Sequence, residues 1–272
     1  MRIIVTGGNS GVGRATASAM AAAGHDVVIA CRTLAKGHEA AATMSGDVEI
    51  RELDLADLAS VRKFADTVDS VDVLVNNAGV LGLPLTRTVD GFEAHMGTNH
   101  LGHFALTCLL GDRIRDRVVA VSSTSYITAQ LDFDDLNYHQ RKYKPFAAYG
   151  ESKLANLLFV RELVARGKTA YASDPGMTNT AITRGSSVMQ RAGRVISPYL
   201  AQSPADGARS TIQAITTTLP NGTYFSPRGL MHQWGRPKPT TLKPKAVDLA
   251  SARRLWELSA ELTGCEWQEG SE

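Results

Sequence analysis

Tyr149 and Lys153, in the segment YGESK, stand four residues apart, which is about one turn of an α-helix. In a helix this spacing places both side chains on one face, so that an ammonium group can lie beside a phenol. The phenol of free tyrosine has a pKa of about 10, and a nearby positive charge lowers that pKa, so that the hydroxyl can exchange a proton near neutral pH. The pair therefore indicates acid–base chemistry, although the same spacing is also common on exposed helices.

A glycine-rich turn lies near the start of the chain, in MRIIVTGGNSGVGRATASAM. It separates a short apolar run at 3–5 from a segment of good helix formers. A strand that turns through glycines into a helix presents free backbone N–H groups at the helix start, and such a site binds anions, usually phosphate. An isolated match could also be only a tight connection between a strand and a helix. The four glycines are Gly7, Gly8, Gly11 and Gly13.

Small or polar residues end four further strand-like segments. In open α/β sheets, ligands bind at the carboxyl ends of the strands, where the strand order reverses. The pattern therefore predicts an elongated ligand lying across one edge of the sheet. The residues at these strand ends are Cys31 and Arg32, Asp54 and Leu55, Asn76 to Gly79, and Ser122 and Ser123.

The elements that must position these residues alternate between strand-like and helix-like patterns. Such alternation predicts βαβ units with right-handed crossovers and an α/β fold, a Rossmann-like doubly wound parallel sheet with helices on both faces. We find no linker, so residues 1–272 are expected to form a single domain. The stretch 235–245, rich in proline and lysine, is predicted to be an exposed loop before a last helix near 247–263. The predicted strands are 3–5, 26–30, 47–53, 72–79, 117–123 and the segment KTAYASDPG.

The composition is that of an ordinary soluble globular protein, with 43% hydrophobic and 21% charged residues. A net charge of +2 gives no electrostatic support for nucleic-acid binding. The three cysteines form no CxxC pair, which favours reduced thiols in the cytoplasm. No apolar stretch approaches the roughly 18 residues of a membrane span, so no membrane anchor is expected. His100 and His103 lack a third ligand nearby, so we expect packing histidines and no metal site.

Six motifs in order resemble those of the short-chain dehydrogenase/reductase family, from residue 2 to about residue 180. TGGNSGVG resembles the family's TGxxxGxG cofactor loop, and the others are NNAG at 76–79, Asn99, VSS at 121–123, YGESK at 149–153 and DPGMTNT at 174–180. The segments ACR, NHLGHF and YGESKLANLLF are most similar to the retinol-dehydrogenase and protochlorophyllide-reductase branches. The resemblance implies a Rossmann-like domain, a nicotinamide cofactor, and hydride transfer to or from a carbonyl carbon.

The resemblance also implies the catalytic roles. Ser123 would hydrogen-bond the substrate oxygen while Tyr149 exchanges the proton. Lys153 would hold the cofactor ribose and, together with the positive charge of an oxidised nicotinamide, lower the pKa of the phenol. Asn99 would shape a helix kink and hold a water that connects to Lys153, or it could be a simple capping asparagine. Ser122 would point the other way, since strand side chains alternate, as a core or cofactor-lining hydroxyl.

The same resemblance implies the residues that hold the cofactor. Asp54 would accept from the adenine amino group, although it could also be a helix N-cap, a role for which Asp57 is better placed. Pro175 and Gly176 would pack on the nicotinamide, and Thr180 would bind its carboxamide or the pyrophosphate. The full predicted set is Gly7, Asn9, Ser10, Gly11, Val12, Gly13, Arg32, Asp54, Leu55, Asn76, Ala78, Gly79, Tyr149, Lys153, Pro175, Gly176, Met177, Thr178 and Thr180.

The end of the second strand predicts NADP(H) as the cofactor. NAD-binding domains usually place an acidic residue there to accept from the ribose 2′-hydroxyl. Here the position is Cys31, followed by Arg32, which could bind a 2′-phosphate through two hydrogen bonds, with Asn9 and Ser10 as further donors. The alternative is that Arg32 is a solvated charge stacked on the adenine.

The chain departs from many family members between Ser123 and Tyr149, where 25 residues intervene, about twice the usual number. We expect this insertion to form one wall of a lipophilic pocket and residues 181–200 to form a second, although the same apolar residues could cover an ordinary core helix. The substrate itself is not identified by the sequence. The aromatic residues expected in the first wall are Tyr126, Phe133, Tyr138, Tyr143 and Phe146.

These observations favour an NADP(H)-dependent oxidoreductase that acts on a small alcohol or carbonyl compound. The alternatives are a non-catalytic NADP(H)-binding sensor, and an epimerase or dehydratase that uses the cofactor transiently. The helix from Tyr149 onward is apolar around much of its circumference, so a homodimer or homotetramer is expected, unless the insertion covers the second face and leaves a monomer.

Overall fold

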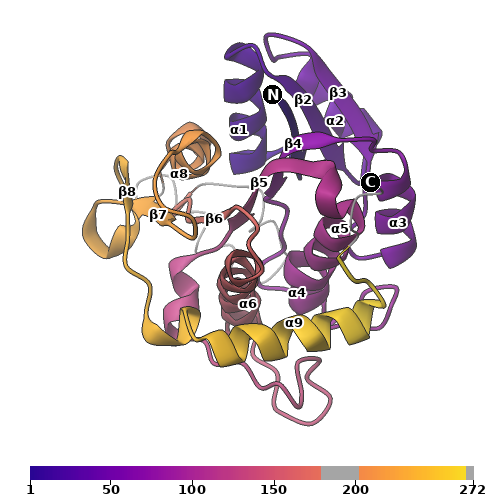
Figure 1. Ribbon diagram of the computed structural model, residues 1–272, viewed down its shortest axis with the longest axis vertical. Helices are drawn as coiled ribbons and strands as arrows, with labels where there is room; N and C mark the ends of the chain where they lie inside the picture. Colours follow the sequence, from indigo (N-terminus) through magenta and orange to yellow (C-terminus); the bar gives the residue numbers. More distant parts are fainter. Residues whose placement is uncertain (179–201, 268–272) are drawn as a thin grey trace.

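The computed structural model describes residues 1–178 and 202–267, and its centre is one eight-stranded sheet (Figure 1). The strand order is β3-β2-β1-β4-β5-β6-β7-β8, with all pairings parallel except that between β7 and β8. The predicted doubly wound α/β fold is therefore confirmed. The strands are β1 Arg2–Thr6, β2 Asp26–Cys31, β3 Val48–Glu52, β4 Val71–Asn76, β5 Ile114–Val121, β6 Ala170–Ser173, β7 Tyr224–Pro227 and β8 Pro237–Pro239.

Helices cover both faces of the sheet because its central strands are apolar on both sides. In β1, Ile3 and Val5 face the core beneath α1 and α8, whereas Ile4 faces the core beneath α3, α5 and α6. Among the described residues, no helix is long and apolar enough to cross a membrane. The helices are α1 Gly11–Ala22, α2 Leu34–Ala41, α3 Leu58–Asp66, α4 Ala94–Met96, α5 Gly102–Leu110, α6 Pro145–Ala165, α8 Pro204–Thr216 and α9 Leu249–Thr263.

The stretch predicted to be an exposed loop, 235–245, contains the short edge strand β8. Pro237 and Pro239 pair with Pro227 and Phe225 of β7. Proline lacks the N–H that a central strand must donate, but an edge strand can turn that side to solvent. The prolines that argued against a strand are therefore compatible with this one position at the sheet edge.

Helix α6 is covered on its second face by α9, which crosses it in Figure 1. Trp256 of α9 stacks on Phe159 of α6 with ring centroids 5.8 Å apart and meets Phe104 of α5 edge-on at 5.0 Å. The 3-10 turn η3, Thr124–Thr128, lies on α6 as well. The apolar circumference of α6 is thus buried within a single chain.

Candidate active site

The glycine turn after β1 has the geometry of a phosphate-binding loop. Gly7 and Gly11 have φ angles of 65° and 54°, a region that favours glycine. A Cβ at Gly13 would lie 2.3 Å from Nδ2 of Asn77 and 2.6 Å from the oxygen of Gly7. Ser10 is the N-cap of α1, but its side chain makes no capping hydrogen bond with a described residue, so the first amides of α1 remain available to an anion.

Asn77, a predicted strand-end residue that was not among the predicted cofactor-binding residues, holds this turn against the end of β4. Its Nδ2 donates to the oxygen of Thr6 at 2.7 Å, while the N–H groups of Asn77 and Ala78 donate to the Thr6 hydroxyl at 2.9 Å each. His103 contacts the same hydroxyl through Nε2 at 2.8 Å and the oxygen of Asn99 through Nδ1 at 3.0 Å. The second asparagine of NNAG was the sequence feature that could have predicted that Asn77 holds the turn.

Both histidines of the predicted packing pair are buried and neutral. Burial lowers the pKa of His103 to about 3 and that of His100 to about 4. A neutral His103 therefore donates from Nδ1 to Asn99 and accepts at Nε2 from the Thr6 hydroxyl, while His100 contacts the Ser259 hydroxyl at 2.9 Å. No group of three potential metal ligands occurs in residues 1–178 or 202–267.

The end of β2 presents Arg32 to solvent. Cys31 is buried, with its Sγ directed at the oxygen of Thr33, and burial raises the pKa of its thiol. Arg32 is exposed and has no hydrogen bond or ion pair within the described part of the chain. A guanidinium group at a strand end next to the phosphate loop suits the 2′-phosphate of a nucleotide.

The residues at the ends of β3 and β4 differ in how much of their side chains could contact a ligand. Asp54 is half-buried, and its Oδ1 accepts from the N–H of Ala56 at 2.9 Å, whereas Asp57 is the N-cap of α3. Leu55 is buried. Asn76 is also buried, and its Nδ2 donates to Thr107 of α5 at 2.9 Å. The side chain of Asn76 therefore lies in the core, and only its main chain could contact a cofactor.

Ser123 and Tyr149 meet at the end of β5, close enough for the Ser123 side chain to lower the pKa of the Tyr149 phenol. Lys153 is buried, its Nζ lies 5.6 Å from the centre of the Tyr149 ring, and it donates to the oxygen of Val121 at 3.1 Å. Ser122 points the other way, as alternation in a strand predicts, and donates to the oxygen of Lys153 at 2.8 Å. The structure thus brings three of the four predicted catalytic side chains, those of Ser123, Tyr149 and Lys153, together.

The direction of the Tyr149 pKa differs from the prediction made from the Tyr149–Lys153 spacing. Burial raises the pKa of Tyr149, the Asp174 carboxylate raises it further, and the nearby Ser123 side chain lowers it. Burial also lowers the pKa of Lys153 to about 8, so its ammonium loses part of its charge near that pH. In the protein alone, desolvation and the Asp174 charge therefore outweigh the attraction expected from Lys153.

Asn99 lies in a π-helical turn, Gly97–Leu101, between α4 and α5, which agrees with a helix irregularity at this residue. Its Oδ1 accepts from the N–H of Val80 at 2.8 Å, and its Nδ2 donates to the oxygen of Val80 and to Ser152. A Cβ at Gly79 would lie 3.2 Å from Oδ1 of Asn99 and 3.6 Å from Nζ of Lys153. Asn99 therefore holds the backbone at Ala78 and Gly79 beside Lys153. The water predicted to connect Asn99 to Lys153 remains a prediction.

The segment after β6, for which cofactor binding is predicted, is held by hydrogen bonds to its neighbours. Gly176 has a φ of 68°, and its N–H donates to Asp174 at 2.7 Å. Pro175 and Thr178 are half-buried and Met177 is exposed, while Thr180 and the expected second pocket wall, 181–200, lie outside the described residues. The N–H of Met177 donates to the oxygen of Gln233, which ties the loop to the connection between β7 and β8.

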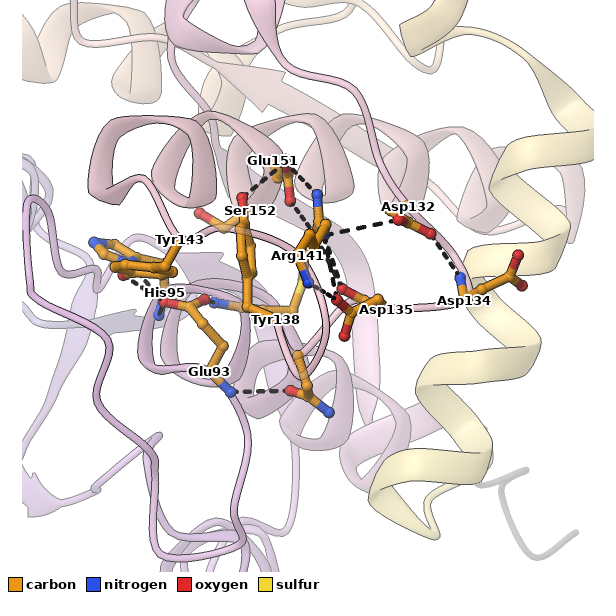
Figure 2. Close-up of polar contacts among 12 residues, drawn as sticks. Glu93, His95, Asp132, Asp134, Asp135, Tyr138, Arg141, Tyr143, Glu151 and Ser152 are labelled. Carbon is orange, nitrogen blue, oxygen red and sulfur yellow. Dashed lines mark hydrogen bonds and ion pairs between the residues drawn. The ribbon is translucent and has the colours of Figure 1, made fainter.

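The insertion before α6 is held by a network of buried and half-buried polar groups (Figure 2). Glu151 of α6 accepts from the Tyr138 hydroxyl at 2.9 Å and forms an ion pair with Arg141 at 2.9 Å. The Tyr143 hydroxyl contacts Glu93 and His95. The aromatic wall prediction was wrong for Tyr138, which these contacts bury.

The other aromatic residues of the insertion are distributed between interior and surface. Tyr126 is buried against Tyr224, which also departs from the prediction of a pocket wall. Phe133 packs on the core, whereas Phe146 is 58% exposed one turn before Tyr149. Of the five aromatic residues, Phe146 is therefore the most exposed.

Comparison with known proteins shows to which family the chain belongs. The short chain dehydrogenase family pattern matches residues 1–191. Retinol dehydrogenase 12 of Mus musculus is 40% identical over 98% of this chain and 87% of its own length, and retinol dehydrogenase 13 of Homo sapiens is 40% identical over 97% and 85%. A crystal structure of an uncharacterized protein from Mycobacterium paratuberculosis has a TM-score of 0.84 and 43% identity, covering 98% of this chain and 95% of that one.

The relatives agree with the branch that the sequence motifs indicate. The relatives match nearly the whole chain, and the family pattern spans residues 1–191, the part that contains the glycine turn and Ser123, Tyr149 and Lys153. The chain belongs to the short chain dehydrogenase family and is an oxidoreductase of that family.

Proposed function

We propose that the chain is an NADP(H)-dependent oxidoreductase that transfers a hydride between the nicotinamide and a lipophilic alcohol or carbonyl compound. The observation that carries this proposal is the convergence of Ser123, Tyr149 and Lys153 beside the glycine turn. Ala78 and Gly79, which follow β4, lie between the catalytic side chains and the glycine turn. Ala78 lies against Gly7, and Gly79 lies against Lys153. A proton-exchanging phenol and a phosphate-binding turn therefore share one edge of the sheet.

Ser123, Tyr149 and Lys153 each have a different role in the proposed reaction. The Ser123 hydroxyl donates to the substrate oxygen and fixes it beside the phenol of Tyr149. Tyr149 gives its proton to that oxygen during reduction, and takes it back during oxidation. Lys153, held by Val121, places its positive charge beside the phenol. A bound nicotinamide cofactor supplies or accepts the hydride at the substrate carbon.

The choice of NADP(H) over NAD(H) rests on the end of β2. Cys31 offers no carboxylate to a ribose 2′-hydroxyl, and Arg32 stands exposed beside the uncapped start of α1. An added 2′-phosphate would meet a guanidinium group rather than the negative charge typical of NAD-binding domains.

The preference for a lipophilic substrate rests on large apolar side chains that stand exposed near the catalytic residues. Phe146 precedes Tyr149 by one turn, and Met177 follows the Pro175–Gly176 loop with 45% exposure. The named relatives are retinol dehydrogenases, and a retinoid aldehyde therefore belongs among the substrates to be tested. Phe146→Ala is expected to lower kcat/KM severalfold for long-chain aldehydes and little for short ones.

We further propose that α6 is not an interface between copies of this chain. The observation is that α9 and η3 already bury its apolar residues, including Leu154, Leu158 and Leu163. The alternative of a monomer, which the sequence left open, is therefore favoured over a dimer built on α6.

The experiment that tests the function follows NADPH absorbance with lipophilic aldehydes, ketones and quinones. Oxidation of NADPH with equimolar alcohol formation is the expected result. Substrate conversion without a net change in absorbance would instead identify an epimerase or dehydratase. Tight NADPH binding without conversion of any compound would favour a sensor.

A further inference from the structure

The connection between β7 and β8 is a hairpin whose tip exposes two large apolar side chains. Leu230 is 78% exposed and Met231 is 75% exposed. Met231 and His232 have φ angles of 52° and 60°, in a left-handed region that residues other than glycine rarely adopt. Backbone strain of this kind is concentrated in segments that serve a function. The tip therefore combines two features that folding alone does not favour.

Hydrogen bonds from neighbouring residues hold the tip in this conformation. Nε2 of Gln233 donates to the backbone oxygen of Met231 at 3.0 Å. The Ser226 hydroxyl, at the end of β7, contacts Nδ1 of His232 at 3.1 Å. The exposure of Leu230 and Met231 therefore belongs to a defined turn of the chain.

Positively charged side chains flank this apolar tip. Arg228 and Arg236 stand opposite each other across the hairpin, where the N–H of Arg228 donates to the backbone oxygen of Arg236 at 2.9 Å. Lys238 follows two residues later, and all three side chains are exposed. None of the three forms an ion pair with any residue that the structure describes, and the sequence 207–247 contains no aspartate or glutamate. Like charges opposite each other in a hairpin are destabilising, so an anionic partner would stabilise this face.

The hairpin lies beside the candidate active site. It follows the carboxyl end of β7, which is parallel to β6 and β5, so it begins at the edge of the sheet that carries Ser123. Nε2 of Gln233 donates to the Thr124 hydroxyl at 3.0 Å, and the backbone oxygen of Gln233 accepts from the N–H of Met177 at 3.3 Å. Since β7 and β8 are the last two strands of the sheet, the hairpin lies at the periphery of the molecule (Figure 1). The exposed tip is therefore at the outer side of the site.

We propose that this hairpin docks the protein on the surface of a bilayer that contains anionic phospholipids. Leu230 and Met231 enter the boundary between headgroups and acyl chains, while Arg228, Arg236 and Lys238 meet the phosphate groups. Both kinds of side chain suit such a surface, because it is negatively charged outside and apolar beneath. Docking brings the candidate active site to the membrane, where lipophilic alcohols and aldehydes concentrate.

The test is flotation of the full chain with two kinds of vesicle, phosphatidylcholine alone and phosphatidylcholine mixed with phosphatidylglycerol. The wild type is expected to bind the mixed vesicles, and less as the salt concentration rises, since salt screens exposed charges. Leu230→Ser/Met231→Ser is expected to lower the affinity for mixed vesicles at least about tenfold, because it removes the apolar side chains. Arg228→Gln/Arg236→Gln is expected to lower it about 25-fold, or about fivefold for each charge.

The matched controls change similar side chains elsewhere on the surface. Val89→Ser removes an apolar side chain that is 79% exposed in the connection between β4 and α4. Lys36→Gln/Lys63→Gln removes two exposed charges from α2 and α3, on the other side of the molecule (Figure 1). Both controls are expected to bind mixed vesicles as the wild type does. A wild type that does not bind mixed vesicles, or controls that lose as much affinity as the hairpin variants, would overturn the inference.

A kinetic measurement separates docking from substrate binding. With a short, water-soluble aldehyde and NADPH in the absence of vesicles, both hairpin variants are expected to keep the kcat/KM of the wild type. A fall in kcat/KM together with unchanged vesicle binding would assign Leu230 and Met231 to the substrate pocket and contradict the inference. Vesicle binding requires no turnover, so a wild type that converts no alcohol or carbonyl compound would end the proposed function and leave the docking test intact.

Discussion

The Nζ atom of Lys153 lies 5.6 Å from the centre of the Tyr149 ring, yet its hydrogen bond goes to the backbone oxygen of Val121 at 3.1 Å. The end of β5 therefore holds the lysine in place before any substrate or cofactor binds. The same strand end carries Ser123, so that one backbone segment positions two of the predicted catalytic side chains. The same burial lowers the pKa of Lys153 to about 8, so that its positive charge is partly lost near that pH.

Lys153→Met is expected to lower kcat by about 100-fold and to weaken cofactor binding, because the variant loses both the charge beside Tyr149 and a donor to the cofactor. Steady-state kinetics and fluorescence titration with NADPH measure the two effects. Asn156→Leu is the matched control, since Asn156 donates to the same Val121 oxygen at 3.1 Å. Equal losses in both variants would mean that the Val121 contact, and not the charge of Lys153, matters.

Arg32→Ala is expected to raise the Kd for NADPH by about ten- to a hundred-fold, which corresponds to the loss of one charge-assisted interaction of about 1.5–3 kcal/mol. The Kd for NADH is expected to change little, because NADH lacks the 2′-phosphate. Isothermal titration with both cofactors decides the matter. Equal weakening of both would show that Arg32 stacks on the adenine instead of binding the phosphate.

His100→Gln tests the stability contributed by a neutral buried histidine. Burial lowers the pKa of His100 from 6.5 to about 4, so the unfolded chain binds this proton first as the pH falls. The contribution is fully present above pH 6.5 and is lost as the pH falls toward 4. The wild type is expected to lose about 2 kcal/mol of unfolding free energy from His100 between pH 7 and pH 5.

Glutamine keeps a nitrogen near the Ser259 hydroxyl but cannot be protonated, so its variant is expected to show a smaller loss over the same pH range. Urea denaturation at the two pH values measures the difference. His103 and the other titrating groups remain in both proteins, so their contributions cancel in the comparison. An identical pH dependence in wild type and variant would show that His100 does not contribute in this way.

Light scattering at micromolar concentration is expected to give a mass of about 29 kDa, that of one chain. The physical reason is that Trp256 and the rest of α9 occupy the α6 surface that a partner chain would need. Trp256→Ala is expected to destabilise the protein by about 3–5 kcal/mol, because it removes a large aromatic side chain from the core. A mass of two or four chains for the wild type would contradict the assignment.

Much of the sheet was predictable because its strands are continuous apolar runs separated by helical periodicity, as in 26–30 and 58–68. The strand β8 was missed because prolines argue against a strand everywhere except at an edge, and the sequence does not show which strand lies at the edge. The sequence placed Asn76 among the cofactor-binding residues without showing that its side chain points into the core. Its neighbour Thr107 comes from a helix that follows much later in the chain.

The convergence of Ser123, Tyr149 and Lys153 was predictable because the spacing of residues within short motifs is local. Their electrostatics were not, because the groups that set the pKa of Tyr149 come from distant segments. Asp174 is charged in the sequence, but its burial and its approach to Tyr149 depend on the parallel pairing of β5 and β6. A prediction from the Tyr149–Lys153 spacing alone therefore gave the opposite direction of the shift.

Tyr149→Phe tests the central claim most directly, because it removes one hydroxyl and leaves the ring in place. We expect kcat for carbonyl reduction with NADPH to fall by about 10²–10⁴-fold, the usual contribution of a positioned acid, while the Kd for NADPH changes little. Single-turnover absorbance and fluorescence titration on the same preparation measure the two quantities. Turnover near the wild-type rate in Tyr149→Phe would contradict the account.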